Sequence, residues 1–316
     1  MKKLFALAAL LLCQPLGIAR DIATPVKHVV AVDIGHTPAH PGAISASGIP
    51  EYKFNKAVVE KINTALLASS NVEPYIVTSS DTLTLQGRTR LAAAHGAELF
   101  IAIHHDSAQD KYLHSWEVDG QPQQYADEFS GYGVFFSRKN TESEASLEFA
   151  RLLGDQMAAR GFHFSRHHAE PIRGENREIV DDEAGVYRFD NLIVLRTAQM
   201  PAVLLECGVI VNRVEEKLLL TSERQQKIAD AVAAAVKQFF STPGRLIHSP
   251  AAATTPVASV IGPKLTPMPS VTTTRPRSLL QRVFSKRQTG ISATPSPVPP
   301  RATKSASPSD DEAEEP

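Results

Sequence analysis

Residues 99–106 of the chain read Leu-Phe-Ile-Ala-Ile-His-His-Asp. Five consecutive apolar residues predict a strand that is buried on both faces, which is typical of a parallel sheet covered by helices. Residues 201–208 read Pro-Ala-Val-Leu-Leu-Glu-Cys-Gly and have the same form, with a carboxylate near the end. Because open α/β sheets bind ligands at the carboxyl ends of their strands, the two runs predict a functional site at one sheet edge.

Short β-rich runs alternate with amphipathic stretches from about residue 27 to residue 240. Residues 51–68, for example, carry an apolar residue at every fourth position from Phe54 to Leu66, which predicts one apolar helix face. The alternation predicts a single α/β domain with a mostly parallel twisted sheet and helices on both of its faces. The expected strands are His28–Asp33, Tyr75–Thr78, Leu99–His104, Gly133–Ser137, Leu192–Arg196 and Ala202–Glu206, and the expected helices are Glu51–Ala68, Leu85–His95, Glu142–Arg160 and Glu223–Phe240.

The amino-terminal residues have the pattern of an export signal. Two lysines precede an apolar run over residues 4–12, and small residues follow at Gly17 and Ala19. This pattern predicts a cleaved signal peptide over residues 1–19. A retained anchor is the alternative, but the apolar run is too short to cross about 30 Å of hydrocarbon. We therefore expect an exported protein of the periplasm or cell wall, with no membrane span in the mature chain.

Residues 241–316 are rich in Pro, Ser, Thr and Ala and show little apolar periodicity. Such a segment buries too little surface to offset its ordering entropy, so we expect a disordered tail. The tail carries only basic charges up to Lys304 and then ends in an acidic run at residues 310–315. A solvated linker is favoured over a tether to anionic wall polymer or lipid.

The charge and cysteine content argue against a nucleic-acid partner and against an intramolecular disulfide. The chain has 33 basic and 34 acidic residues, a formal net charge of −1, and therefore no global field that would attract nucleic acid. It has two cysteines, and Cys13 lies in the expected signal peptide, so the mature chain cannot form an intramolecular disulfide. The remaining Cys207 is expected to be a small buried thiol rather than a nucleophile.

Four residues near strand ends and at a helix start could perform hydrolytic chemistry. His36 follows the first expected strand, His104 ends the run quoted above, Glu51 opens the first amphipathic helix, and Glu206 ends the last strand. Singly, each could be an ordinary loop histidine or a helix-dipole charge. Together, two imidazoles and one carboxylate form a three-ligand set for Zn²⁺ with one position open for water, and a second carboxylate can accept a proton. His105 points to the opposite face of its strand, so we expect it to be a surface or outer-layer residue.

Four short motifs occur in order along the expected domain. They are Asp-x-Gly-His at 33–36, Gly-x-x-Glu at 48–51 with Asn55 four residues on, Ile-His-His-Asp at 103–106, and Pro-Ala-Val-Leu-Leu-Glu-x-Gly-x-x-x-Asn at 201–212. This set resembles the zinc N-acetylmuramoyl-L-alanine amidases of the type 3 family, from about His28 to Phe240. Ile34, Thr37, Cys207 and Val209 depart from the residues usual in that family, but none of these changes removes a proposed ligand.

The resemblance implies both residue roles and an activity. It implies that His36, Glu51 and His104 bind zinc and that Glu206 is the catalytic carboxylate. The implied reaction is hydrolysis of the amide bond between N-acetylmuramic acid and L-alanine in peptidoglycan, in cell-wall remodelling or daughter-cell separation. Two alternatives stay open: a non-catalytic peptidoglycan-binding regulator with the same fold, and a zinc peptidase that acts elsewhere on the stem peptide. The presence of all four residues disfavours the regulator.

Three further features match the family or its variants. Arg88 and Arg196 stand at family positions, and we expect them to be structural or substrate-contact residues. Some relatives carry an insertion that folds over the metal and is displaced by an activator protein. Residues 165–190, which hold two histidines and seven acidic residues, could be such a lid or a solvated loop that lines the cleft. Peptidoglycan is thus the expected partner. An activator protein is expected as well if residues 165–190 form a lid.

Overall fold

The computed structural model describes residues 27–78 and 80–241. The expected signal peptide and residues 242–316 of the expected tail lie outside this range. In chain order the elements are β1 (His28–Ile34), α1 (Glu51–Leu67), β2 (Val72–Val77), α2 (Leu85–Ala94), β3 (Leu99–Asp106), η1 (Asp110–Tyr112), β4 (His114–Val118), β5 (Gln121–Tyr125), β6 (Gly133–Phe136), α3 (Ser143–Ala158), η2 (His167–Ala169), β7 (Glu178–Asp181), β8 (Val186–Arg188), α4 (Ile193–Thr197), β9 (Ala202–Val209), α5 (Glu215–Leu219) and α6 (Ser222–Ser241).

The main sheet has seven strands in the order β2-β1-β3-β9-β6-β8-β7. Neighbours β2, β1, β3 and β9 are parallel, as are β6 and β8, whereas β6 is antiparallel to β9 and β7 is antiparallel to β8. The two runs first read in the sequence are the central pair, β3 and β9, and every residue of both strands is buried. The predicted fold class, a mostly parallel sheet in a single α/β domain, is confirmed.

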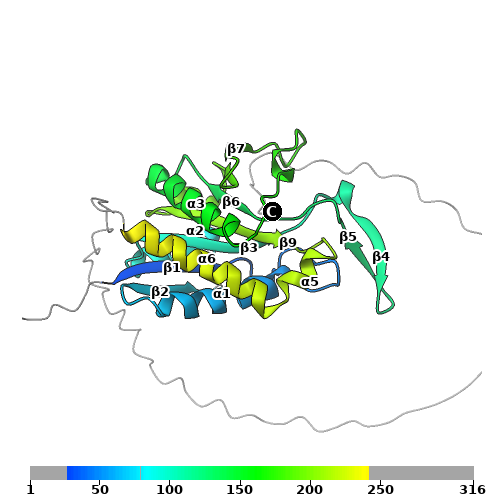
Figure 1. Ribbon diagram of the computed structural model, residues 1–316, viewed down its shortest axis with the longest axis horizontal. Coiled ribbons are helices and arrows are strands. Elements are labelled where there is room, and N and C mark those ends of the chain that lie inside the picture. The colour runs from blue at the N-terminus through cyan, green and yellow to red at the C-terminus, as the bar shows by residue number, and fades with distance from the viewer. Residues whose placement is uncertain (1–26, 79, 242–316) are drawn as a thin grey trace, which may run out of the picture. The chain divides into compact units, whose positions relative to one another are not determined.

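Helices cover both faces of this sheet. Figure 1 shows α1, α6 and α3 lying side by side across one face, and their apolar residues share one large buried cluster with the strands. The α1 stripe from Phe54 to Leu66 is buried there, as expected, and each such side chain contributes about 1.5–3 kcal/mol. Helices α2 and α4 pack on the opposite face around a second cluster. The helix predictions are therefore confirmed to within a few residues.

One expected strand is wrong. Residues 193–196 lie in helix α4, Ile193–Thr197, and Leu192 directly precedes it, although the β-branched residues here favour a strand. Val194 and Leu195 are buried against the second cluster, and Asn140 Nδ2 donates to the carbonyls of Leu195, Ala198 and Met200 at 2.7–3.3 Å. A short apolar run does not distinguish a buried helical turn from a buried strand, and the packing context decides here.

A two-stranded hairpin, β4 and β5, was not expected. Asp119 and Gly120 form its turn with φ angles of 51° and 74°. Two positive φ values are those of a type I′ turn, for which Asp-Gly is a strong sequence signal. The hairpin lies beside the main sheet at the carboxyl-end side of β3 and β9 (Figure 1), where Trp116 Nε1 donates to the Ala46 carbonyl at 2.7 Å.

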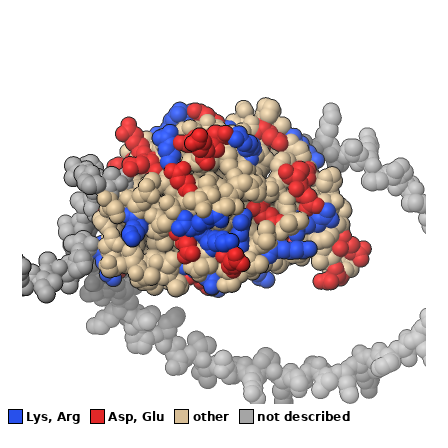
Figure 2. Space-filling model, in the orientation of Figure 1, with Lys and Arg blue, Asp and Glu red and all other residues tan. Residues whose placement is uncertain are grey.

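The surface is mixed in charge. Figure 2 shows Lys and Arg side chains interspersed with Asp and Glu side chains over the face in view. No helix within residues 27–78 and 80–241 is long and apolar enough to cross a membrane. The mixed pattern agrees with the formal net charge of −1.

Candidate active site

The loop after β1 places His36 in an unusual backbone conformation. Its φ is 65°, in the left-handed region that non-glycine residues seldom adopt. The buried Arg88 of α2 stabilises this loop: Nη1 donates to both carboxylate oxygens of Asp33 at 3.1 Å and to the Ile34 carbonyl at 2.7 Å, and Nη2 donates to the His36 carbonyl at 3.0 Å. Of the two expected roles for Arg88, the structure shows the structural one.

Two glycines allow the side chains of the site to approach the backbone closely. A Cβ atom on Gly35 would lie 2.5 Å from Nε2 of His104, inside any van der Waals contact. A Cβ atom on Gly42 would lie 2.3 Å from a carboxylate oxygen of Glu51 and 2.5 Å from the His36 ring. The glycine of the Asp-x-Gly-His motif is therefore required by the close approach of the His104 ring.

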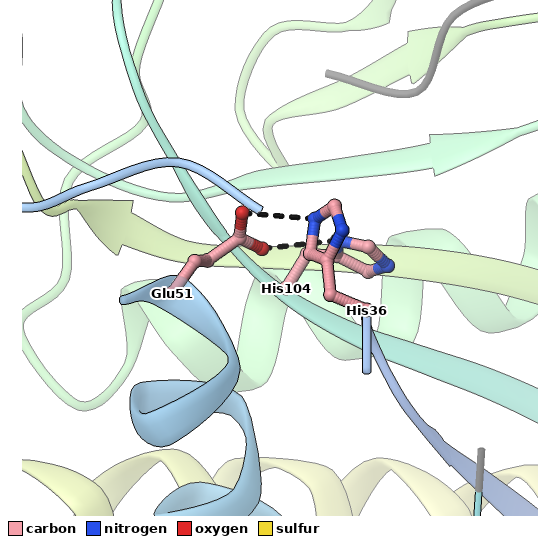
Figure 3. Close-up of side chains that lie close together, drawn as sticks. All are labelled: His36, Glu51 and His104. Carbon is pink, nitrogen blue, oxygen red and sulfur yellow. Dashed lines mark hydrogen bonds and ion pairs between the residues drawn. The ribbon is translucent and has the colours of Figure 1, made fainter. Parts of the chain in front are cut away.

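Glu51 connects the two histidines. It is the first residue of α1, follows Pro50, and is 1% exposed. Its Oε2 lies 2.9 Å from His36 Nε2, and its Oε1 lies 3.1 Å from His104 Nδ1 (Figure 3). The two imidazole rings meet edge to face, with centroids 4.9 Å apart. Three residues from β1, α1 and β3, far apart in sequence, thus converge at the carboxyl ends of the strands.

The electrostatics keep Glu51 ionised. Burial alone would raise the pKa of this carboxyl, but the hydrogen bonds and positive charges of His104 and His36 outweigh it and hold the pKa well below its usual range. One donor atom from each of the three residues lies within 4.8 Å of the others. An anionic oxygen and two imidazole nitrogens are the donor types of a catalytic metal centre, so the group can hold a metal ion.

An outer layer of side chains orients these donors. Asn55, one turn along α1, donates from Nδ2 to Glu51 Oε1 at 3.0 Å and to the Gly35 carbonyl at 3.2 Å. Its Oδ1 lies 2.7 Å from Nδ1 of His105. Burial lowers the pKa of His105 to about 3, so its ring is neutral near pH 7 and donates to Asn55. His105 is therefore an outer-layer residue that is buried, not a surface one.

Glu206 lies on the strand beside His104. The β3 and β9 register pairs His104 with Glu206, which places both side chains on the same face of the sheet. Glu206 is 2% exposed. The next residue, Cys207, is a fully buried free thiol whose pKa is raised by burial and by nearby carboxylates, as expected of a packing residue. Arg196 is exposed on α4, away from these contacts.

Sequence reasoning missed a second cluster, formed by Asp106 with His167 and His168. Asp106 Oδ2 lies 3.0 Å from His167 Nε2 and 2.8 Å from His168 Nε2. All three residues are buried, although the segment 165–190 reads as a solvated loop or lid. Two adjacent histidines in a polar loop were the available signal, but their partner lies more than sixty residues away.

Comparisons with known proteins point to one family. A family model described as N-acetylmuramoyl-L-alanine amidase matches residues 30–238. N-acetylmuramoyl-L-alanine amidase AmiA of Escherichia coli (strain K12) is 27% identical over 242 residues, which cover 68% of this chain and 76% of AmiA.

Solved structures share the fold. The catalytic domain of CwlV, an N-acetylmuramoyl-L-alanine amidase from Bacillus (Paenibacillus) polymyxa, superposes with a TM-score of 0.51 at 26% identity, covering 68% of this chain and 98% of that one. Ami1 from Mycobacterium smegmatis gives a TM-score of 0.53 at 22% identity, covering 69% and 99%. The family model spans more than half of the chain, and the fold of the described residues matches that of the CwlV catalytic domain. This chain therefore belongs to the N-acetylmuramoyl-L-alanine amidase family of cell-wall hydrolases.

Proposed function

We propose that the chain is a zinc-dependent enzyme that hydrolyses the amide bond between N-acetylmuramic acid and L-alanine in peptidoglycan. The observation that carries the proposal is the convergence of His36, Glu51 and His104 on one point, beside Glu206 of the neighbouring strand. These three residues would hold Zn²⁺. When bound there, the ion supplies a Lewis acid that polarises the substrate carbonyl and lowers the pKa of water.

Glu206 has the role of proton carrier in this proposal. Its carboxylate takes a proton from the attacking water and passes it to the amide nitrogen as the bond to L-alanine breaks. The products are a lactyl carboxylate on the sugar and a stem peptide with a free amine. Asn55 and His105 keep Glu51 in position throughout, because Asn55 Nδ2 and the backbone N–H of His105 both donate to Glu51 Oε1, and the His105 ring donates to Asn55 Oδ1.

We further propose that the protein acts after export, in the periplasm or cell wall, in wall remodelling or daughter-cell separation. The basic, apolar and small-residue pattern of residues 1–19 supports export. The substrate lies outside the cytoplasmic membrane, which agrees with this location.

The segment 165–190 has features that support a lid. Glu206 is almost fully buried, and Arg177 of this segment lies near it: burial lowers the pKa of Arg177, and the charges of Glu175, Asp106 and Glu206 oppose that shift. We propose that an activator protein moves residues 170–177 of this segment, which precede the sheet strands β7 and β8, to admit substrate. Replacing residues 170–174 with two glycines should then raise kcat/KM several-fold in the absence of any partner. An unchanged value would favour a loop that only lines the cleft.

Digestion of purified peptidoglycan tests the activity. We expect the chain from Arg20 onward to release stem peptides that begin with L-alanine, to lose this activity on chelation, and to regain it with Zn²⁺. Mass spectrometry of the products separates the alternatives. Peptides cut at an internal bond would indicate a zinc peptidase, and binding to peptidoglycan without products, even with residues 170–174 shortened, would indicate a non-catalytic regulator.

A further inference from the structure

We propose that Asp106, His167 and His168 form a second site for a divalent transition metal, with Zn²⁺ as the expected occupant. The site shares no residue with the His36, Glu51 and His104 group. Its donor atoms are Asp106 Oδ2 and the Nε2 atoms of the two histidines, all within 4.8 Å of one another. Two imidazoles and one carboxylate are a common ligand set for zinc.

The distances are close to those that a metal requires. Asp106 Oδ2 lies 3.0 Å from one Nε2 and 2.8 Å from the other, and the two rings lie with centroids 4.0 Å apart. Donors 2.0–2.1 Å from a tetrahedral zinc ion are themselves about 3.3 Å apart. Asp106 Oδ2 therefore needs to move away from each Nε2 atom by only a few tenths of an ångström to admit the ion.

The outer contacts of both histidines also fit a metal site. His168 Nδ1 lies 2.7 Å from Oε2 of Glu175, which can only accept, so this nitrogen carries a proton. His167 Nδ1 lies 2.8 Å from the Ser165 hydroxyl. A His168 ring that carries its proton on Nδ1 presents Nε2 to Asp106 Oδ2, so either a metal ion or a second proton lies between these two atoms. A carboxylate or hydroxyl behind each histidine is the usual second layer of a metal site.

The site is enclosed but can be reached. The three donor side chains are 5% exposed or less. His167 also lines a cavity of about 430 Å³ together with Phe129, Ser165 and Glu170, and this cavity gives metal and a fourth ligand a way in. Since buried charges are normally paired or coordinate metals, a buried carboxylate facing two imidazoles fits this use.

A bound ion would connect two parts of the chain that matter for the enzyme. Asp106 ends β3, two residues after His104, whereas His167 and His168 form η2 at the start of segment 165–190. Arg177, which lies near Glu206, donates its backbone N–H to the His168 carbonyl at 2.7 Å. The second metal would thus anchor this segment to the strand that carries a ligand of the first.

The competing occupant of this position is a proton. Burial alone would lower the pKa of His168, but Asp106 and Glu175 outweigh it and raise the pKa to about 9, so a charged His168 could satisfy Asp106 in place of a metal. Metal counting distinguishes the two, because a protonated histidine binds no metal.

The test measures bound zinc by inductively coupled plasma mass spectrometry. The chain from Arg20 onward is stripped with chelator, equilibrated with micromolar Zn²⁺ and freed of unbound metal by gel filtration. We expect two equivalents in the unmodified chain and one in His36→Gln, His167→Gln and His168→Gln. His163→Gln is the matched control, because His163 is an exposed imidazole in the same region whose Nε2 forms a hydrogen bond with Ser130. This control should keep two equivalents.

The outcomes separate this inference from the proposed function. A single equivalent that is lost in His168→Gln and kept in His36→Gln would support the second site while contradicting the first. A single equivalent that is lost in His36→Gln and kept in His168→Gln, or no bound zinc at all, would overturn the inference. If the His167 and His168 variants do not fold by circular dichroism, the His36→Gln chain decides: one equivalent, with a rise in Tm on adding Zn²⁺, supports the site, and none excludes it.

Discussion

Replacing Glu206 with glutamine is expected to lower kcat on peptidoglycan by about 10²–10⁴-fold, because the amide cannot accept the proton of the attacking water. Glutamine has nearly the same volume, and Glu206 is not one of the three residues assigned to the metal, so zinc content and Tm should stay near those of the unmodified chain. The measurements are product release by mass spectrometry and zinc content on the same preparation.

Glu223→Gln is the control for this substitution. Glu223 is exposed in the first turn of α6, where its Oε1 pairs with Lys227 at 2.9 Å. The same change of charge there should leave kcat unchanged. Turnover of Glu206→Gln at the level of the control would remove Glu206 from the mechanism.

Replacing Arg88 with alanine is expected to lower the free energy of unfolding by about 3–5 kcal/mol, because it leaves the buried carboxylate of Asp33 without its counter-ion. The same change removes the donors to the Ile34 and His36 carbonyls. The left-handed conformation of His36 then loses its support, so zinc affinity should fall together with stability. Urea unfolding and a zinc titration measure the two effects.

Two variants on the same helix calibrate this result. Arg90→Ala removes an exposed arginine from α2 and should change stability by less than about 0.5 kcal/mol. Arg88→Lys keeps the charge but lacks the planar fork that reaches Asp33 and two carbonyls at once, so it should fall between the unmodified chain and Arg88→Ala. If the Arg88→Ala chain were as stable as the Arg90→Ala chain, the Arg88 hydrogen bonds would not be what stabilises the loop that carries His36.

Local patterns were enough to identify most elements of the described fold. Strands β3 and β9 are apolar along their whole length because both faces are buried, and α1 and α6 show an apolar stripe because only one face is. The ends of the buried strands also indicate candidate site residues, since a polar side chain directly after a buried strand must find a partner. That reasoning located His36, His104 and Glu206 before any contact was known.

Some errors arose where local signals were weak or overruled. The five residues of α4 are too few to show a helical period, and Asn140, more than fifty positions away, accounts for three of the carbonyls at its end. The turn at Asp119 and Gly120 was readable but lay between strands of mostly polar residues, which show no buried face. The antiparallel pairing of β6 with β9 leaves no mark on either strand.

The fold class, the main helices and the residue types that gather at the strand ends therefore follow from local sequence patterns, because periodicity and apolar runs are properties of neighbouring residues. Which side chains meet depends on the packing of the whole domain. The register of β3 on β9 sets Glu206 beside His104, Asn55 joins His105 to Glu51, and the segment 165–190 folds back so that its two histidines face Asp106. Each of these contacts depends on distance in space between residues that lie far apart along the chain, and a linear pattern carries no record of it.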